Sequence, residues 1–290
     1  MTRICALTLA VSLIPHVLSG AADSASGSVV VQKLGTIRVV NAVAYIVRDQ
    51  RNARATQTEI LLSDVPVDPA PIRSALSPHM NAINVDVLKD RNYVLLWVRT
   101  DGSVAMNATF SKTMTQFIDD TTGRLKIAWT TNSASRLEGR LFSAAPLKTM
   151  DGTTYTVDLT FGVDVPTPEA GTALPDGGGD PGKALLALLT AAKSKNWPAI
   201  KAASGPNALK MFDRSYNSPA ENAADAADLL SAWLPAQKTK ITGGQLRGDV
   251  AILDVEGEMF PGQLGLSLAR MVKSGNTWVF DQAAQAGMIR

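Results

Sequence analysis

The sequence predicts two domains of different class: an all-β sandwich over residues 23–165, and an α+β fold with helices packed on an antiparallel sheet over residues 184–290. Three observations support this prediction. Apolar and polar residues alternate along much of residues 28–165, proline and glycine are concentrated in residues 166–183, and helical patterns precede strand patterns in the remainder. The 290 residues are enough for about two domains, each with its own core.

Residues 1–22 have the pattern of a signal peptide. Arg3 supplies a positive charge, residues 4–18 are uncharged and mostly apolar, and the small residues Ser19-Gly20-Ala21-Ala22 follow. We expect cleavage after Ala21 or Ala22 and a periplasmic or secreted product. An uncleaved anchor is the alternative, although the apolar run is short for a membrane span. No later segment is long and apolar enough to span a bilayer, so we expect none after cleavage.

The composition of the mature chain excludes several kinds of site. Cys5 is the only cysteine and leaves with the signal peptide, so the mature chain has no thiol and no disulfide. His16 leaves as well, and one histidine without cysteine excludes a structural zinc site. Loss of Arg3 reduces the 28 basic residues to 27, against 26 acidic residues. This balance creates no general field for nucleic acid or for an anionic membrane, and we expect no metal, cofactor or nucleic-acid partner.

The first domain is predicted from a period of two in the apolar residues, which is the side-chain spacing on one face of a strand. The pattern is clearest from Tyr155 to Val165. Shorter alternating stretches and two fuller apolar runs occur at residues 83–87, 104–110, 125–129, 39–47 and 93–98. Turn residues separate them at Asp101-Gly102, Thr122-Gly123 and Asp151-Gly152. We also expect a short helix or irregular turn near residues 69–76, and the strand order stays open.

Residues 166–183 are predicted to form a linker, because four prolines and five glycines occur in this stretch. Gly177, Gly179 and Gly182 match the G-x-G-x-x-G spacing of dinucleotide-binding loops. That mechanism needs a buried strand before the glycines and a parallel βαβ unit, neither of which the sequence indicates. Asp176 and Asp180 lack the spaced acidic ligands of a calcium loop.

The second domain begins with helical patterns and ends with strand patterns. Helices are expected at residues 184–193, 199–203 and 207–216, and a fourth runs to Trp233. The fourth has the strongest start signal, because Ser218-Pro219-Ala220-Glu221 combines a capping box with a proline in the first turn. Strands are expected near residues 240–247, 249–257, 263–273 and 277–283.

Several segments of this domain form a recognisable set. They are the leucine-rich first helix, Lys195-Asn196-Trp197-Pro198-Ala199-Ile200-Lys201, Ile241-Thr242-Gly243-Gly244, Gly248-Asp249-Val250-Ala251 and Lys273-Ser274-Gly275-Asn276-Thr277-Trp278. With them, residues 183–290 resemble the nuclear transport factor 2-like superfamily, in particular its small exported members. The family usually has a Gly-Asp-Trp turn where this chain has Asn196-Trp197. The resemblance implies a cone-like fold, in which helices and a curved sheet enclose a cavity, and it identifies a fold more than a function.

Catalytic residues are not clearly indicated. His79, the only mature histidine, lies in Ser77-Pro78-His79-Met80 without a nucleophile-elbow sequence, and we interpret it as a loop or surface residue. The superfamily includes isomerases and dehydratases, which need a cavity carboxylate of tuned pKa and an oxyanion donor. The candidates for those roles are Asp213, Asp254, Asp281 and Tyr216, although no spacing selects them.

Three arginines, Arg48, Arg51 and Arg54, form a basic cluster with a single acidic residue between them. Because the surroundings are polar, we interpret the cluster as a solvated hairpin tip. The functional alternative is contact with an anion or with an acidic partner.

Five aromatic residues of the second domain are candidates for lining a cavity: Trp197, Phe212, Tyr216, Trp233 and Trp278. Aromatic residues on amphipathic elements more often belong to a core, and an apolar ligand pocket is the alternative. We therefore predict an exported, non-enzymatic module of the cell envelope that binds a protein partner or an apolar small molecule. The alternatives are an isomerase- or dehydratase-like enzyme that uses the cavity, and a purely structural role. The oligomeric state stays open.

Overall fold

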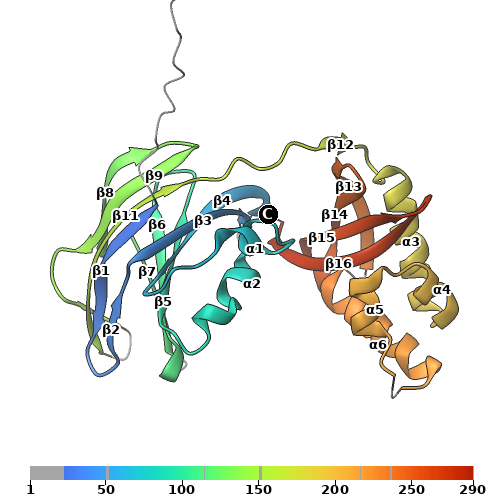
Figure 1. The fold of residues 1–290 in the computed structure, drawn as a ribbon, viewed down its shortest axis with the longest axis horizontal. Helices are drawn as coiled ribbons and strands as arrows, with labels where there is room; N and C mark the ends of the chain where they lie inside the picture. Colours follow the sequence, from blue (N-terminus) through green and yellow to red (C-terminus); the bar gives the residue numbers. More distant parts are fainter. Residues whose placement is uncertain are drawn as a thin grey trace, which may run out of the picture.

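The computed structural model describes residues 23–49, 52–113, 115–149, 152–215, 217–235 and 237–289, so the predicted signal peptide lies outside the described residues. The chain forms two parts, each built on antiparallel strands and joined by an extended segment between β11 and β12 (Figure 1). In these ranges, no helix has the length and apolar character needed to cross a membrane.

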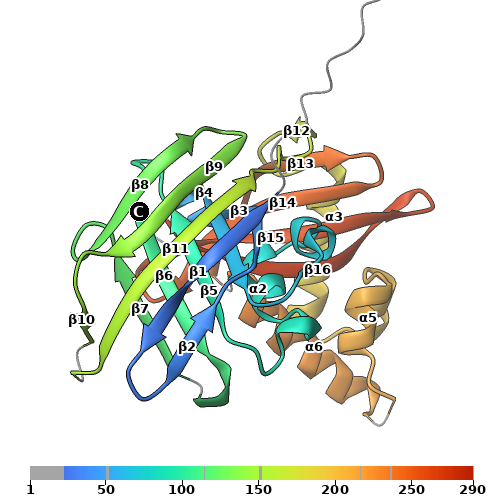
Figure 2. The same cartoon turned by 60° about the vertical axis from the view of Figure 1, so that its left-hand side comes forward.

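The N-terminal part contains two antiparallel sheets. The first has the strand order β2-β1-β11-β9-β8, with β10 also paired to β11 (Figure 2). Its strands are β1 (Ser24–Val31), β2 (Gly35–Arg38), β8 (Leu125–Asn132), β9 (Arg136–Ser143), β10 (Leu147–Lys148) and β11 (Thr154–Asp164). The second sheet follows chain order and contains β3 (Asn41–Asp49), β4 (Asn52–Ser63), β5 (Tyr93–Val98), β6 (Val104–Phe110) and β7 (Thr115–Asp120), with the 3-10 helix η2 (Ser111–Thr113) between the last two.

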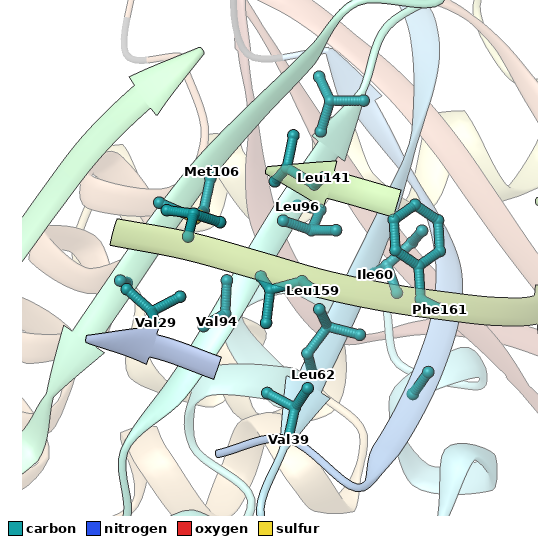
Figure 3. Packing of buried hydrophobic residues seen from close by; sticks show 14 of the residues in the cluster. Val29, Val39, Ile60, Leu62, Val94, Leu96, Met106, Leu141, Leu159 and Phe161 are labelled. Atoms are coloured by element: carbon teal, nitrogen blue, oxygen red, sulfur yellow. The ribbon is translucent and has the colours of Figure 1, made fainter. Parts of the chain in front are cut away.

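The two sheets of the N-terminal part share one hydrophobic core. Along β11 the buried residues alternate with exposed or half-buried ones, as the sequence predicts for residues 155–165. Figure 3 shows Leu159 and Phe161 of β11 beside Ile60, Leu62 and Leu96 of the second sheet. Two antiparallel sheets around a common core are compatible with a β-sandwich.

A short helical segment covers the outer face of the second sheet. It contains α1 (Pro69–Arg73), α2 (Pro78–Ile83) and the 3-10 helix η1 (Asp86–Leu88), and we call these elements the helical cover. The cover and the sheet share a second hydrophobic cluster, which includes Ile72, Ala82, Leu88, Val43, Leu61 and Leu95. The strand predicted at residues 83–87 is therefore wrong. Pro78 starts α2, Ile83 and Val85 pack against the second hydrophobic cluster, and Val87 is exposed.

The C-terminal part is a five-stranded antiparallel sheet with the order β12-β13-β14-β15-β16. Its strands are β12 (Thr172–Leu174), β13 (Gln237–Arg247), β14 (Val250–Phe260), β15 (Gln263–Ser274) and β16 (Thr277–Met288). The helices are α3 (Gly179–Lys193), α4 (Trp197–Ala202), α5 (Pro206–Phe212) and α6 (Pro219–Trp233). The predicted capping box is confirmed, because Ser218 and Glu221 exchange side-chain and backbone hydrogen bonds at the start of α6.

The α+β class predicted for residues 184–290, a cone of helices on a sheet, is wrong. Half of the chain is strand and 23% is helix, with three antiparallel sheets and six α-helices among the described residues, and the C-terminal part is a sheet. Element length explains the difference. The strands β13 to β16 have 11 or 12 residues each, whereas α4 and α5 have six and seven. Two of the four predicted helices are thus short, and α3 and α6 have 15 residues each, so the long strands dominate this part of the chain.

The segment predicted as a linker, residues 166–183, includes regular structure near its end. β12 pairs with β13, and α3 begins at Gly179. Gly177 and Gly179 have φ angles of +81° and +61°, a region that favours glycine. A Cβ atom on Gly182 would overlap the carbonyl oxygen of Gly177. The glycine spacing therefore builds a tight turn from strand to helix, and because β12 is antiparallel to its neighbour, no parallel βαβ unit surrounds it.

Candidate functional site

Glu59 on β4 has a fully buried side chain beneath the helical cover. Tyr45 on β3 and Trp97 on β5 occupy the positions directly opposite Glu59 in the neighbouring strands. Nε1 of Trp97 donates a hydrogen bond to Oε1 of Glu59 at 2.9 Å, and Nδ1 of His79 lies 2.8 Å from Oε2. Ring nitrogens from two different elements therefore hold the two carboxylate oxygens.

His79 lies on α2, so its interpretation as a loop residue is wrong, and its side chain is 23% exposed. The hydrogen bond with Glu59 raises the pKa of His79, and burial opposes this effect. Burial, and then the charge of Glu59, raise the pKa of Tyr45 well above its usual value. A carboxylate that orients an imidazole is one half of a general acid–base site. Among the described residues, no hydroxyl group is hydrogen-bonded to the His79 ring.

Arg48 and Arg54 connect the two parts of the chain. Nη2 of Arg48 lies 3.1 Å from Oδ1 of Asp254, while Nε and Nη2 of Arg54 donate to the two carboxylate oxygens of Glu256 at 3.2 and 2.9 Å. In the same region β16 contacts β3 and β4 (Figure 1). The solvated-tip interpretation is therefore incomplete, because an acidic partner lies in the same chain. Arg51 lies outside the described residues.

The three aspartates considered for catalysis have separate partners. Burial raises the pKa of Asp254 and outweighs the opposing effect of Arg48. Asp281 on β16 is buried and accepts a hydrogen bond from Nδ2 of Asn207 at 3.3 Å, and it also lies 3.4 Å from Nε of Arg270. The third aspartate, Asp213, lies 2.8 Å from Nζ of Lys201. The interactions of these carboxylates do not join them into one site.

The aromatic candidates of the second part belong to its core. Phe212 is fully buried, and its ring centroid lies 6.3 Å from that of Trp233 and 6.2 Å from that of Phe280. Trp197 and Trp278 are partly buried and pack against the same cluster. Tyr216 lies outside the described residues. The four described aromatic residues therefore pack in or against the hydrophobic core of the C-terminal part, where the prediction had them line a ligand cavity.

A groove of about 390 Å³ lies at one end of the N-terminal part, where β4 and β5 approach the turn between β8 and β9. We call it the end groove. Ile46, Val98 and Leu137 contribute apolar surface that continues the hydrophobic core between the sheets. Its polar lining residues are Thr56, Gln57, Thr58, Arg99, Thr100, Asn132 and Ser133.

The charge of Arg99, which lines the end groove, is partly compensated by neighbouring side chains. Its Nη2 lies 3.8 Å from Oδ2 of Asp120, and its Nη1 donates to Oγ of Ser103 at 3.2 Å. A second groove, of about 420 Å³, lies near Val30, Pro146 and Thr156 and has fewer polar groups. The end groove is therefore the better candidate for recognition of a polar molecule.

Sequence reasoning missed both Glu59 and the end groove. The strand that carries Glu59 was not predicted, because its first eight residues, NARATQTE, are mostly polar. One signal was available: a single acidic residue directly precedes the apolar run Ile60-Leu61-Leu62. The lining of the groove comes from four separate segments of the chain, so no local sequence pattern indicates it.

No family model matches this chain, and comparison with curated proteins and with solved structures finds no similar protein. The resemblance of residues 183–290 to the nuclear transport factor 2-like superfamily therefore stays a prediction.

Proposed function

We propose that the protein is an exported, non-enzymatic module of the cell envelope that binds a small polar ligand in the end groove. The observation that supports this proposal is the composition of the groove, where an apolar floor meets hydrogen-bonding side chains from three chain segments. Small-molecule sites commonly combine these two features in volumes of about 300–1,000 Å³. The signal-peptide pattern of residues 1–22 supports export.

The lining favours a neutral ligand with several hydroxyl or amide groups. Gln57, Thr58 and Asn132 have no side-chain hydrogen-bond partner among the described residues, so their polar atoms are available to a ligand. Arg99 already has an acidic neighbour, which weakens the case for an anion. This ligand differs from the apolar one expected from the sequence, because the aromatic residues on which that expectation depended are packed into a core.

The proposal is tested by titrating the full chain with glucose, maltose, N-acetylglucosamine, glycylglycine and inorganic phosphate, using calorimetry. We expect at least one of the neutral probes to bind and phosphate to bind no better. Thr100→Trp should abolish binding by filling the groove, and Asn132→Ala should weaken it about threefold to tenfold, which corresponds to one hydrogen bond.

The matched control is Thr156→Trp, which places the same side chain in the second groove. Binding should be unchanged in this variant. The proposal is wrong if none of the neutral probes binds, or if Thr100→Trp binds as well as the unmodified chain.

A further inference from the structure

Glu59 and His79 join two elements that have few other polar contacts with each other. The carboxylate belongs to the sheet, whereas the imidazole belongs to the helical cover, and His79 is the only cationic partner of Glu59 among the described residues. We infer that the Glu59–His79 pair is a pH-sensitive latch, which holds the helical cover on the second sheet and weakens when the histidine loses its proton. The inference does not depend on the function proposed for the end groove.

The burial of Glu59 gives the latch its energetic basis. A charged carboxylate without exposed surface is strongly destabilising unless a cation and hydrogen bonds compensate it. Trp97 supplies a hydrogen bond but no charge, so protonated His79 is the compensating cation. Neutral His79 can still donate its Nδ1 proton, but the ion pair is lost. Without the ion pair, the Glu59 carboxylate is more stable in contact with water than buried. Water reaches it when the helical cover opens.

Other titratable groups near the pair have their own partners or do not change charge near neutral pH. Arg73 on α1 donates a hydrogen bond to the carbonyl oxygen of Ala44. Asp86 in η1 is exposed. The second sheet contributes two titratable groups, Tyr45 and Tyr93. The adjoining strands β16 and β15 contribute Asp281 and Arg270, which are paired with each other. Between about pH 5.5 and 8.5, His79 is therefore the group expected to change charge.

The direction of the effect follows from the raised pKa of His79. A group whose pKa is higher in the closed state than in the open state contributes full stability below its open-state pKa. That contribution disappears as the pH rises through the closed-state pKa. Opening would expose Val43, Leu61 and Leu95, the sheet side of the second hydrophobic cluster. Alkaline conditions should therefore favour an open cover and exposed apolar surface.

The test uses the full chain with His16→Gln, so that His79 is the only histidine whether or not the leader is cleaved. The imidazole resonance gives the pKa of His79 directly, and amide hydrogen exchange of residues 69–88 reports opening, corrected for the intrinsic pH dependence of exchange. We expect the opening equilibrium to rise up to about tenfold for each unit by which the closed-state pKa exceeds the open-state value. Exchange of β11 serves as the internal reference.

Two variants decide the outcome. His79→Gln should make exchange of the cover independent of pH between about 5.5 and 8.5, and His79→Arg should keep the cover closed over the same range. Asp86→Asn is the matched control on the same segment and should behave like the unmodified chain. The latch is wrong if the unmodified chain shows no rise in exchange as His79 titrates, or if the His79→Arg cover opens with pH as the unmodified one does.

Discussion

The guanidinium group of Arg54 on β4 lies 2.9 Å from the carboxylate of Glu256 on β14, more than 200 positions further along the chain. Together with the pair between Arg48 and Asp254, it joins the hairpin of the second sheet to the sheet of the C-terminal part. Because these pairs are partly or largely exposed, their strength depends on the salt concentration. The relative position of the two parts should therefore change when the charges of these ion pairs are altered or screened by salt.

Charge reversal at this junction should separate the two parts. We expect Arg54→Glu to increase the radius of gyration in small-angle scattering at low salt, because two carboxylates then face each other. The double variant Arg54→Glu/Glu256→Arg should restore the compact arrangement. Arg140→Glu, which reverses an exposed arginine paired with Asp158 inside the N-terminal part, is the control. A radius that is the same in Arg54→Glu and in the unmodified chain would show that the ion pair does not hold the parts together.

Local elements of this chain are readable from the sequence, whereas the contacts between distant residues are not. The capping box at Ser218 and the alternation from Tyr155 to Val165 act over a few residues, so composition reveals them. The pair between Arg54 and Glu256 depends on how two separate units meet, which no local pattern encodes. β4 was missed for the same reason: its first eight residues are mostly polar, and pairing with the neighbouring strands β3 and β5 stabilises it.

The second prediction concerns Asp254, whose pKa is raised because burial outweighs its attraction to Arg48. An acid with a raised pKa in the folded state destabilises that state above its folded-state pKa, and the penalty disappears as the pH falls through that value. We therefore expect Asp254→Asn to leave the free energy of unfolding at about pH 7 unchanged or higher, with no gain near pH 3. Chemical denaturation at the two pH values measures this.

Asp158 provides the control of opposite sign. Its hydrogen bond with Arg140 lowers its pKa, so its contribution to stability is present at about pH 7 and is lost as the pH falls through the folded-state pKa. Asp158→Asn should therefore lower the stability at neutral pH, by a small amount because both side chains are exposed. If Asp254→Asn lowers the stability at neutral pH more than Asp158→Asn does, the ion pair with Arg48 outweighs burial and our interpretation is wrong.

Export provides a third prediction. The small residues Ser19-Gly20-Ala21-Ala22 predict a mature N-terminus at Ala22 or Asp23. Expression of the full chain in a Gram-negative host, followed by fractionation and intact-mass measurement, should find the shortened chain in the periplasm or medium. The double variant Ala21→Phe/Ala22→Phe should block cleavage, because it replaces the small residue before either predicted cleavage point with a bulky one. Full-length chain in the cytosol would contradict the predicted export.

The last prediction separates a filled core from a ligand cavity in the C-terminal part. Phe212 is fully buried between Trp233 and Phe280, so Phe212→Ala should lower the free energy of unfolding by about 3–5 kcal/mol. Leu186 on α3 is 44% exposed, and Leu186→Ala is the control, expected to change it by less than about 1 kcal/mol. Urea denaturation measures both variants. A residue that lines an empty cavity has fewer packing contacts to lose on truncation. If Phe212→Ala lowers the free energy of unfolding as little as Leu186→Ala does, the result favours a cavity and contradicts the packed core.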